Sequence, residues 1–203
     1  MVKIHTFQIK MVLTQPDLIK KIKAVNRIYR DLDADITRFR QASGLICPSD
    51  CGECCMKPDL NATVLEFLPA AHHLFVTGTY NSVIEKLDYL ADPVCVFYNP
   101  FARRGMCTNY PGRGLVCRLF GFSVRNDKNG NRSLITCKKI KSTLKPGQIE
   151  PFLDQAPVTS SYSMRLYGID PELSTQYFPV NKAIKRALEL VVFYNDYNSK
   201  ESA

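Results

Sequence analysis

Four cysteines lie within nine residues of this chain, and this group constrains the fold more than any other feature of the sequence. The spacing is Cys47-x3-Cys51-x2-Cys54-Cys55, and the residues between the cysteines are Pro, Ser, Asp, Gly and Glu, a composition typical of loops. Thiolates are soft ligands, and short spacings in a loop let several of them converge on one centre. The sequence therefore predicts irregular cysteine-rich loops gathered around a metal centre.

All the cysteines of the chain are candidate metal ligands: Cys47, Cys51, Cys54, Cys55, Cys95, Cys107, Cys117 and Cys137. A disulfide scaffold is the weaker alternative, because a chain of 203 residues buries roughly 70% of its unfolded surface without covalent links. The first twenty residues lack the continuous apolar run of a secretory signal, so we expect a reducing cytoplasm. No run approaches the roughly 18 apolar residues of a membrane span. Inert buried thiols remain an alternative for single cysteines such as Cys95 or Cys137.

The spacing favours an iron–sulfur cluster, of the 4Fe–4S type, over zinc. Four-cysteine zinc sites usually combine two separated C-x2-C pairs, and only Cys51-x2-Cys54 has that spacing here. Dense grouping is nearer to iron–sulfur spacing, and zinc stays the alternative. The run from Cys47 to Cys54 also has the spacing of radical S-adenosylmethionine enzymes, but the chain lacks the strand–helix alternation of their barrel. Adjacent Cys54 and Cys55 could ligate two neighbouring centres. Alternatively, one of them could ligate the metal while the other lies beside the centre without ligating it.

Hydrophobic periodicity predicts that helices make up most of the remaining chain. Apolar residues at steps of three and four indicate a long helix over residues 15–42, which Gly44 ends. Further helices are predicted over 63–76, where Pro69 breaks or kinks the helix, over 82–90 with Ser82 as its cap, and over 158–168 and 181–196. A short strand is expected over 94–98. Asn129-Gly130 predicts a hairpin between 118–126 and 131–138.

The predicted fold class is thus mainly α with a small antiparallel β-hairpin. We expect a single domain over residues 1–203. Its metal-binding core spans about 44–141, flanked by the N-terminal helix 15–42 and by C-terminal helices within 158–198. Hydrophobic residues at 45% and charged residues at 23% are ordinary for a globular protein and exclude a disordered or collagen-like chain.

Positive charge is concentrated in the segment 101–145. That segment holds eleven Lys and Arg side chains and one acid, Asp127, so its net charge of +10 exceeds the +8 of the whole chain. Part of this charge can compensate the negative charge of a thiolate-bound centre. The excess can instead bind nucleic acid, an acidic protein or an anionic small molecule. Arg113 and Arg118 lie near Cys117, and with Tyr110 they are candidates for contacting the centre or an anion.

The cysteine pattern resembles the YkgJ-type cysteine-cluster family, whose members are described as zinc- or iron-chelating. The matching residues run from Cys47 to Cys137: the four clustered cysteines, Cys95 with Phe97, Gly105 with Cys107, Tyr110, Arg113, Cys117-Arg118 with Phe120, and Cys137. The chain departs from the family at Gly114, where Pro is usual, and this leaves the turn geometry open. Relatives include flagellin lysine N-methylases, so the resemblance implies an iron–sulfur cluster and connects the family with methyl transfer to lysine.

Two functions follow from these features. The first is a cytosolic metalloprotein that binds an iron–sulfur cluster through clustered cysteines and acts in redox or modification chemistry. The second is a zinc-binding structural or interaction module with a basic surface for nucleic acid or an acidic partner. Sequence motifs of serine hydrolases, P-loop nucleotide-binding proteins and H-E-x-x-H metalloproteases do not occur in the chain.

Overall fold

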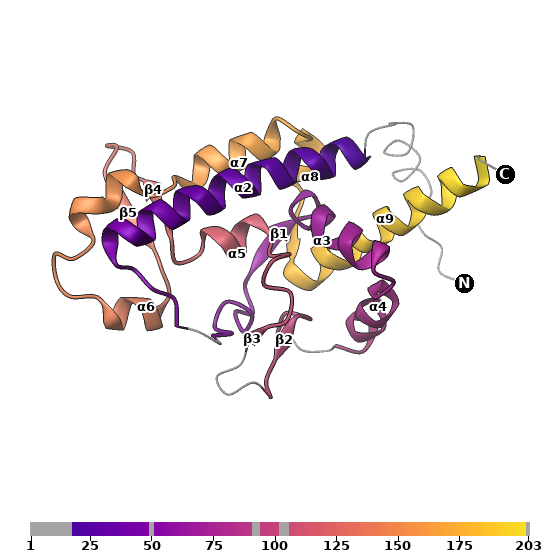
Figure 1. Cartoon of the computed structure of the whole chain (residues 1–203), viewed down its shortest axis with the longest axis horizontal. Helices are drawn as coiled ribbons and strands as arrows, with labels where there is room; N and C mark the ends of the chain where they lie inside the picture. The colour runs from indigo at the N-terminus through magenta and orange to yellow at the C-terminus, as the bar shows by residue number, and fades with distance from the viewer. Residues whose placement is uncertain (1–17, 49–50, 91–93, 102–105, 202–203) are drawn as a thin grey trace.

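The computed structural model describes residues 18–48, 51–90, 94–101 and 106–201, and it places three helices at the centre of the molecule (Figure 1). These helices are α2 (Leu18–Ser43), α3 (Val64–Val76) and α9 (Val180–Glu201). Helix α3 packs against both α2 and α9, and the side chains between them form the hydrophobic core. Burial of this core is the main source of stability for the helical part of the chain.

The remaining elements are short and surround this helical core. The helices are α4 (Tyr80–Tyr89), α5 (Leu115–Leu119), α6 (Lys138–Thr143), the 3-10 helix η1 (Glu150–Gln155), α7 (Thr159–Tyr167) and α8 (Pro171–Thr175). The strands are β1 (Asn61–Thr63), β2 (Tyr98–Asn99), β3 (Met106–Cys107), β4 (Ser123–Asn126), β5 (Arg132–Ile135) and β6 (Tyr177–Pro179). They form the antiparallel pairs β1–β6, β2–β3 and β4–β5. The mainly α fold class with small hairpins is confirmed.

Helix α2 follows its predicted apolar stripe. The side chains of that stripe are buried: Leu18, Ile22, Val25, Ile28, Leu32, Ile36 and Phe39. The helix ends where glycine was expected to end it, since Gly44 has a φ of +68° and its N–H donates to the Arg40 carbonyl at 3.0 Å. The predicted start at residues 15–17 lies outside the described residues. Cys47 follows shortly after the end of α2 at Ser43.

Helix α3 begins with a capping box and runs through its proline. The backbone N–H of Thr63 donates to Oε1 of Glu66 at 2.9 Å, and the Thr63 side chain caps the helix in return. Pro69 was expected to break or kink the helix, and it does not break it, because α3 is continuous from Val64 to Val76. A proline inside a helix costs about 3 kcal/mol, and burial of α3 between α2 and α9 offsets that cost.

Three local predictions need correction. The strand expected over 94–98 contains only Tyr98, because the side chain of Asn181 takes the place of a partner strand: it accepts from the Val96 N–H and donates to the Val94 carbonyl, both at 2.8 Å. Ser82 does not cap α4, which begins two residues earlier, and its Oγ donates to the Thr79 carbonyl.

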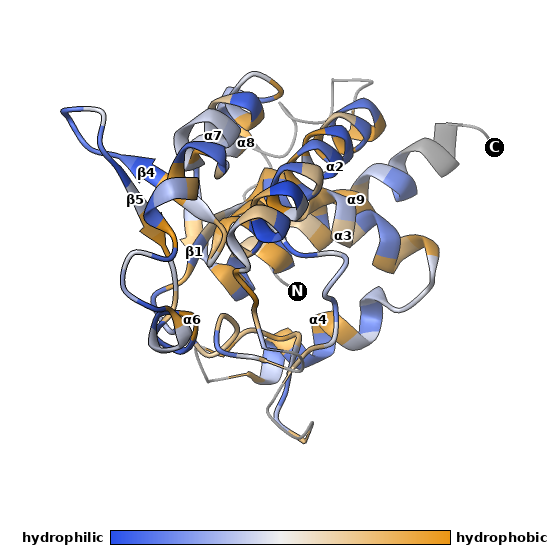
Figure 2. Cartoon of the chain, turned by 60° about the vertical axis from the view of Figure 1, so that its left-hand side comes forward, coloured by the Kyte–Doolittle hydropathy of each residue, from blue (hydrophilic) through white to orange (hydrophobic). Residues whose placement is uncertain are grey.

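The third correction concerns the hairpin around Asn129-Gly130. The hairpin is present as β4 and β5, but β4 starts only at Ser123. Arg118 and Leu119, which were expected in the first strand, belong to α5 with Cys117. Figure 2 shows the hairpin as a hydrophilic projection beside the orange, hydrophobic interior around α3. Within the described part of the chain, no helix is both long and apolar enough to cross a bilayer.

Candidate metal centre

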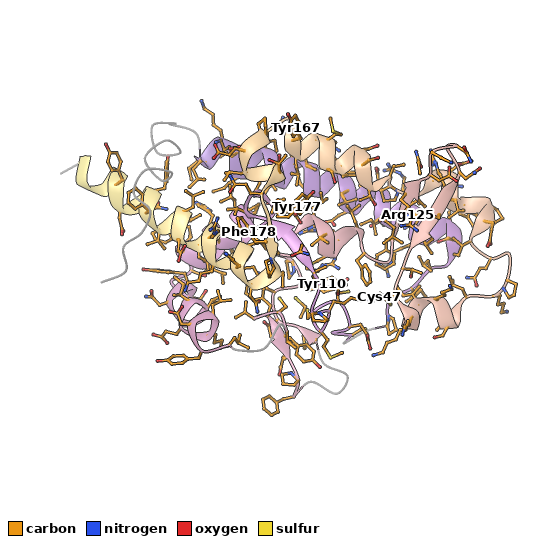
Figure 3. All side chains as sticks on the ribbon, turned by 180° about the vertical axis from the view of Figure 1, so that it is seen from behind. Cys47, Tyr110, Arg125, Tyr167, Tyr177 and Phe178 are labelled. Atoms are coloured by element: carbon orange, nitrogen blue, oxygen red, sulfur yellow. The ribbon has the colours of Figure 1, made fainter. Side chains whose placement is uncertain are left out.

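Seven of the eight cysteines line one pocket between the loops below α2 and α5. They are Cys47, Cys51, Cys54, Cys55, Cys95, Cys107 and Cys117. Aromatic side chains complete the wall, among them Phe67, Phe97 and Phe120. Figure 3 labels Cys47 and Tyr110, which both belong to this pocket and come from segments more than sixty residues apart in the sequence. The fold therefore brings together the thiols that the sequence proposed as ligands.

Neighbouring thiols raise one another's pKa in this pocket. Hydrogen bonding with Cys55 raises the pKa of Cys107, and burial together with the Cys51 thiol raises the pKa of Cys47. All eight cysteines are free of disulfide bonds. These thiols therefore lie close enough together to oppose one another's ionisation.

Backbone hydrogen bonds hold the inner wall of the pocket. The Cys95 N–H donates to the Cys55 carbonyl at 2.8 Å, which ties the cysteine loop to the segment before β2. Cys107 lies opposite Tyr98 in the β2–β3 pair, and the Thr108 N–H donates to the Phe97 carbonyl at 2.8 Å. These hydrogen bonds fix the segments around Cys55, Cys95 and Cys107 against one another without a contribution from metal.

Cys137 lies outside the pocket lining but close to it. It is the N-cap of α6, and the Ile140 N–H donates to its sulfur at 3.4 Å. An ion pair of 3.0 Å between Lys139 and Glu53 ties the start of α6 to the cysteine loop. Cys137 therefore stands at the outer side of the cluster, within electrostatic reach of Cys47.

Burial raises the pKa of several thiols of the pocket. Burial raises the pKa of Cys54 to about 11. The hydrogen bond from Cys107 lowers the pKa of Cys55, but its own bond to Cys95 and burial outweigh this and bring the value to about 12. Burial likewise raises the pKa of Cys117 well above its ordinary range. A metal must therefore displace protons when it binds, as thiolate ligation requires.

Arg113 supplies positive charge at the pocket, as the sequence suggested. It lines the pocket with Tyr110, its Nε donates to the Tyr110 carbonyl at 3.1 Å, and its guanidinium carbon lies 3.6 Å from the centre of the Tyr110 ring. Its charge lowers the pKa of Cys47, Cys54 and Cys107, against the stronger effects that raise them. Arg113 thus favours the thiolate form that a metal needs.

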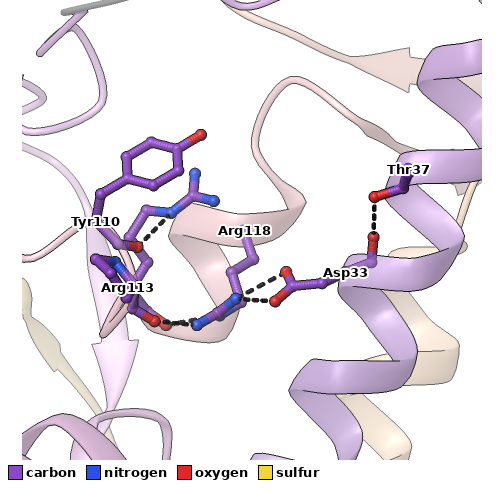
Figure 4. A network of polar contacts seen from close by, with 6 residues as sticks. Asp33, Thr37, Tyr110, Arg113 and Arg118 are labelled. Atoms are coloured by element: carbon purple, nitrogen blue, oxygen red, sulfur yellow. Dashed lines mark hydrogen bonds and ion pairs between the residues drawn. The ribbon is translucent and has the colours of Figure 1, made fainter.

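Arg118 points away from this pocket wall, toward α2. Its guanidinium donates to both carboxylate oxygens of Asp33, at 2.7 and 2.5 Å, and to the backbone carbonyls of Arg113 and Pro111 (Figure 4). It also lies 4.6 Å from the centre of the Tyr29 ring. Arg118 is not among the residues that line the pocket. In this arrangement it fixes the loop that carries Tyr110 and Arg113.

Asn109 was missed by the sequence reasoning and is the best test of whether the pocket fits a sulfur-rich centre. Its Nδ2 atom is buried without an acceptor among the described residues, and the residue lines the pocket. A Cβ on Gly112 would stand 2.5 Å from Asn109 Oδ1, so only glycine lets the amide sit there. A buried donor without an acceptor costs about 1–3 kcal/mol. A thiolate or sulfide in the pocket would supply that acceptor, so the residues fit such a group.

The structure does not place the thiols around a single ion. No three described His, Cys, Asp or Glu side chains are arranged to hold one metal ion together. The role of each cysteine as a ligand, and the anion-binding roles of Tyr110, Arg113 and Arg118, stay predictions. The role of the wider basic segment stays a prediction too, and its Arg103 and Arg104 lie outside the described residues.

Comparison with known families agrees with the cysteine spacing. Residues 46–142 match the model of the family described as "CxxCxxCC: Putative zinc- or iron-chelating domain". No curated protein and no solved structure matches the chain. The matched span begins beside Cys47 and ends within α6, so it contains every cysteine that lines the pocket as well as Cys137. Just under half of the chain, residues 46–142, therefore resembles the CxxCxxCC family.

Proposed function

We propose that the cysteine pocket binds iron–sulfur, as a 4Fe–4S cluster, and that the chain is a cytoplasmic redox or modification protein. The observation that carries the proposal is the lining of one pocket by seven free cysteines, more than one zinc ion can take. Their dense grouping in the sequence is nearer to iron–sulfur spacing than to the two separated C-x2-C pairs of a four-cysteine zinc site.

The groups around the thiols support the same proposal. When bound, a cluster supplies electron transfer or a site for substrate ligation. The side-chain amide of Asn109 would donate to a cluster sulfur, because its buried Nδ2 has no acceptor among the described residues, and its backbone N–H hydrogen-bonds to Cys107. Arg113 stabilises the negative charge of the assembled thiolates. Phe67, Phe97 and Phe120 line the pocket with apolar surface. A reducing cytoplasm keeps the thiols available for metal.

Anaerobic purification tests the proposal directly. We expect brown protein with broad absorption near ~400 nm and matching contents of iron and acid-labile sulfide. Colourless protein with stoichiometric zinc after the same preparation would contradict the iron–sulfur proposal and support the zinc-binding module.

Serine variants of the clustered cysteines test whether the metal binds in the cysteine pocket. We expect Cys51→Ser and Cys54→Ser to lose metal and to unfold more readily, because metal–ligand bonds order the loop. Ser142→Ala is a matched control: Ser142 is an exposed residue of α6, and its hydroxyl bonds only to a local carbonyl. Full metal content in both cysteine variants would show that the metal binds elsewhere.

A further inference from the structure

We propose that Glu66 positions a metal ligand: its buried carboxylate, on α3, holds the first turn of α5 and thereby sets where the Cys117 thiol enters the cysteine pocket. The inference rests on the proposed function in one respect, since Cys117 must bind the metal. It does not depend on whether that metal is iron or zinc. Glu66 is not among the residues that line the pocket, so it acts on the centre only through α5.

Glu66 is an acidic residue in the interior of the protein. It is only 4% exposed, and no other acid is buried in the described part of the chain. Moving a carboxylate out of water is unfavourable unless hydrogen-bond donors replace the water. The donors that replace it here belong to the starts of two helices that are far apart in the sequence.

The two oxygens of the Glu66 carboxylate accept from different elements. Oε1 accepts from the backbone N–H and the hydroxyl of Thr63, at 2.9 and 3.1 Å, at the start of α3. Oε2 accepts from the Val116 N–H of α5 at 2.8 Å. The Tyr29 hydroxyl on α2 donates to the Glu66 carbonyl at 2.8 Å and so holds Glu66 itself. A capping box needs only the contacts of Oε1, and the bond to Val116 is additional.

Helix α5 has no cap from its own side chains. It contains five residues, and its N-cap residue is Gly114, which has no side chain to accept from the first turn. The first N–H groups of a helix have no partner within that helix, and a helix this short needs tertiary contacts to form. Glu66 supplies the acceptor from α3. Glycine leaves room for it, since a Cβ on Gly114 would stand 3.3 Å from Oε2.

Cys117 is held on both sides by this arrangement. Val116, before it, bonds to Glu66 on α3, and Arg118, after it, bonds to Asp33 on α2 (Figure 4). The other cysteines of the pocket lie in loops, turns or a two-residue strand, whereas Cys117 lies on a helix that is attached to the core. The helical core therefore determines the position of this thiol before metal binds.

A double-mutant cycle between Glu66 and Cys117 tests this role in the full-length chain. The probe is the iron or zinc that the anaerobically purified wild type retains, and elemental analysis follows its loss to EDTA. Glu66→Ala removes both acceptor oxygens and should weaken metal retention by about 10- to 100-fold, the range for loss of a group that orients a ligand. In the Cys117→Ser background the same change should have little further effect, because Glu66 acts through that thiol.

Thr63→Val is the matched control. It removes the hydroxyl bond to Oε1 but leaves the bond between Oε2 and Val116, so it should weaken the cap of α3 without changing metal retention. In hydrogen exchange of the metal-free proteins, the α5 amides should lose protection by roughly tenfold in Glu66→Ala, as expected for a buried donor left unpaired, and keep it in Thr63→Val. If Glu66→Ala does not fold, Glu66→Met replaces it, because methionine fills similar space with only a weak acceptor.

The outcomes separate this inference from the proposed function. Zinc in the wild type, with a non-additive cycle, would refute iron–sulfur and keep the role of Glu66. Iron and sulfide in the wild type, with additive effects of the two changes, would keep iron–sulfur and overturn the role of Glu66. Full metal retention in Cys117→Ser, or unchanged exchange of the α5 amides in Glu66→Ala, would also overturn it.

Two further results are decisive. If Cys117→Ser retains no metal, the comparison of Glu66→Ala with Thr63→Val decides, and equal metal retention in those two variants would overturn the role of Glu66. A wild type that retains neither iron nor zinc would overturn both this inference and the proposed function.

Discussion

At the scale of single residues, Arg118 links the cysteine part of the chain to the helical core. Its side chain is only 8% exposed, whereas that of its partner Asp33 is 50% exposed. It donates to two loop carbonyls as well as to the carboxylate, and it stacks near Tyr29. Lysine can reproduce the charge but not the planar fork of donors.

We therefore expect Arg118→Lys to lower the free energy of unfolding by about 1–3 kcal/mol. Arg165→Lys is the matched control, because Arg165 pairs with Asp31 on the same helix at a surface position, where such pairs contribute about 0–1 kcal/mol. Urea unfolding of both variants measures the difference. Equal stability of the two variants would mean that the buried contacts of Arg118 contribute no more than a surface ion pair.

Asn109 concerns the electronic properties of the pocket rather than its stability. If its amide donates to a cluster sulfur, Asn109→Asp replaces a donor with a negative charge and should lower the reduction potential by on the order of tens of millivolts. Thr136→Val is the control, because the Thr136 hydroxyl is also buried without a partner but does not line the pocket. Spectroelectrochemical titration compares them. An unchanged potential in the Asn109 variant would place its amide away from the sulfurs.

At the scale of elements, the junction of α3 and α5 explains the glycine where the family has proline. Gly114 has a φ of −67°, close to the value that a proline ring fixes, so the turn keeps a proline-compatible backbone. A Cβ at this position would stand 2.9 Å from Cζ of Phe67. Glu66 on the same helix accepts from the Val116 N–H of α5 at 2.8 Å. Phe67 thus fills the space beside the turn and lines the pocket.

This junction predicts coupling between two positions. Gly114→Ala should destabilise the protein by about 1–3 kcal/mol through overlap with Phe67. Combined with Phe67→Leu, which removes the overlapping atoms, the same change should cost less than it does alone. Gly168→Ala is the control, since the nearest atom to its Cβ is 3.5 Å away. Additive effects in the double-mutant cycle would contradict the close packing.

The sequence predicted the elements that have a local signal. The α2 stripe, the glycine that ends it and the Asn129-Gly130 hairpin depend on neighbouring residues, and all three are present. Pairing of β1 with β6 and the Asn181 contacts join segments more than eighty residues apart, so no local pattern marks them. The cysteines could be identified as candidate ligands from the sequence, because closely spaced thiols in a loop indicate metal binding or disulfide formation and little else. Asn109 was not, because its role depends on a pocket that exists only after folding.

At the scale of the whole molecule, the core and the cysteine pocket depend on different interactions. Buried apolar side chains hold α2, α3 and α9 together, whereas the pocket segments are short loops and two-residue strands. Metal–ligand bonds would therefore stabilise one part of the chain much more than the other.

Removal of the metal should expose this difference. In hydrogen exchange, amides of α3 and α9 should stay protected after chelation, and those around Cys55, Cys95 and Cys107 should lose protection by at least roughly tenfold, which corresponds to about 1.4 kcal/mol. Mass spectrometry of peptides from both regions measures this, with the α3 and α9 peptides as the internal control. Uniform loss of protection would mean that metal and core form one cooperative unit.

The contacts of the Asn181 side chain also affect when the site can form during translation. It belongs to α9, yet it holds the backbone on both sides of Cys95. A ribosome makes the first cluster of cysteines more than a hundred residues before it makes Asn181. The geometry around Cys95 is therefore complete only after most of the polypeptide has been made. A metal that binds at Cys95 would meet its final ligand arrangement at that late stage.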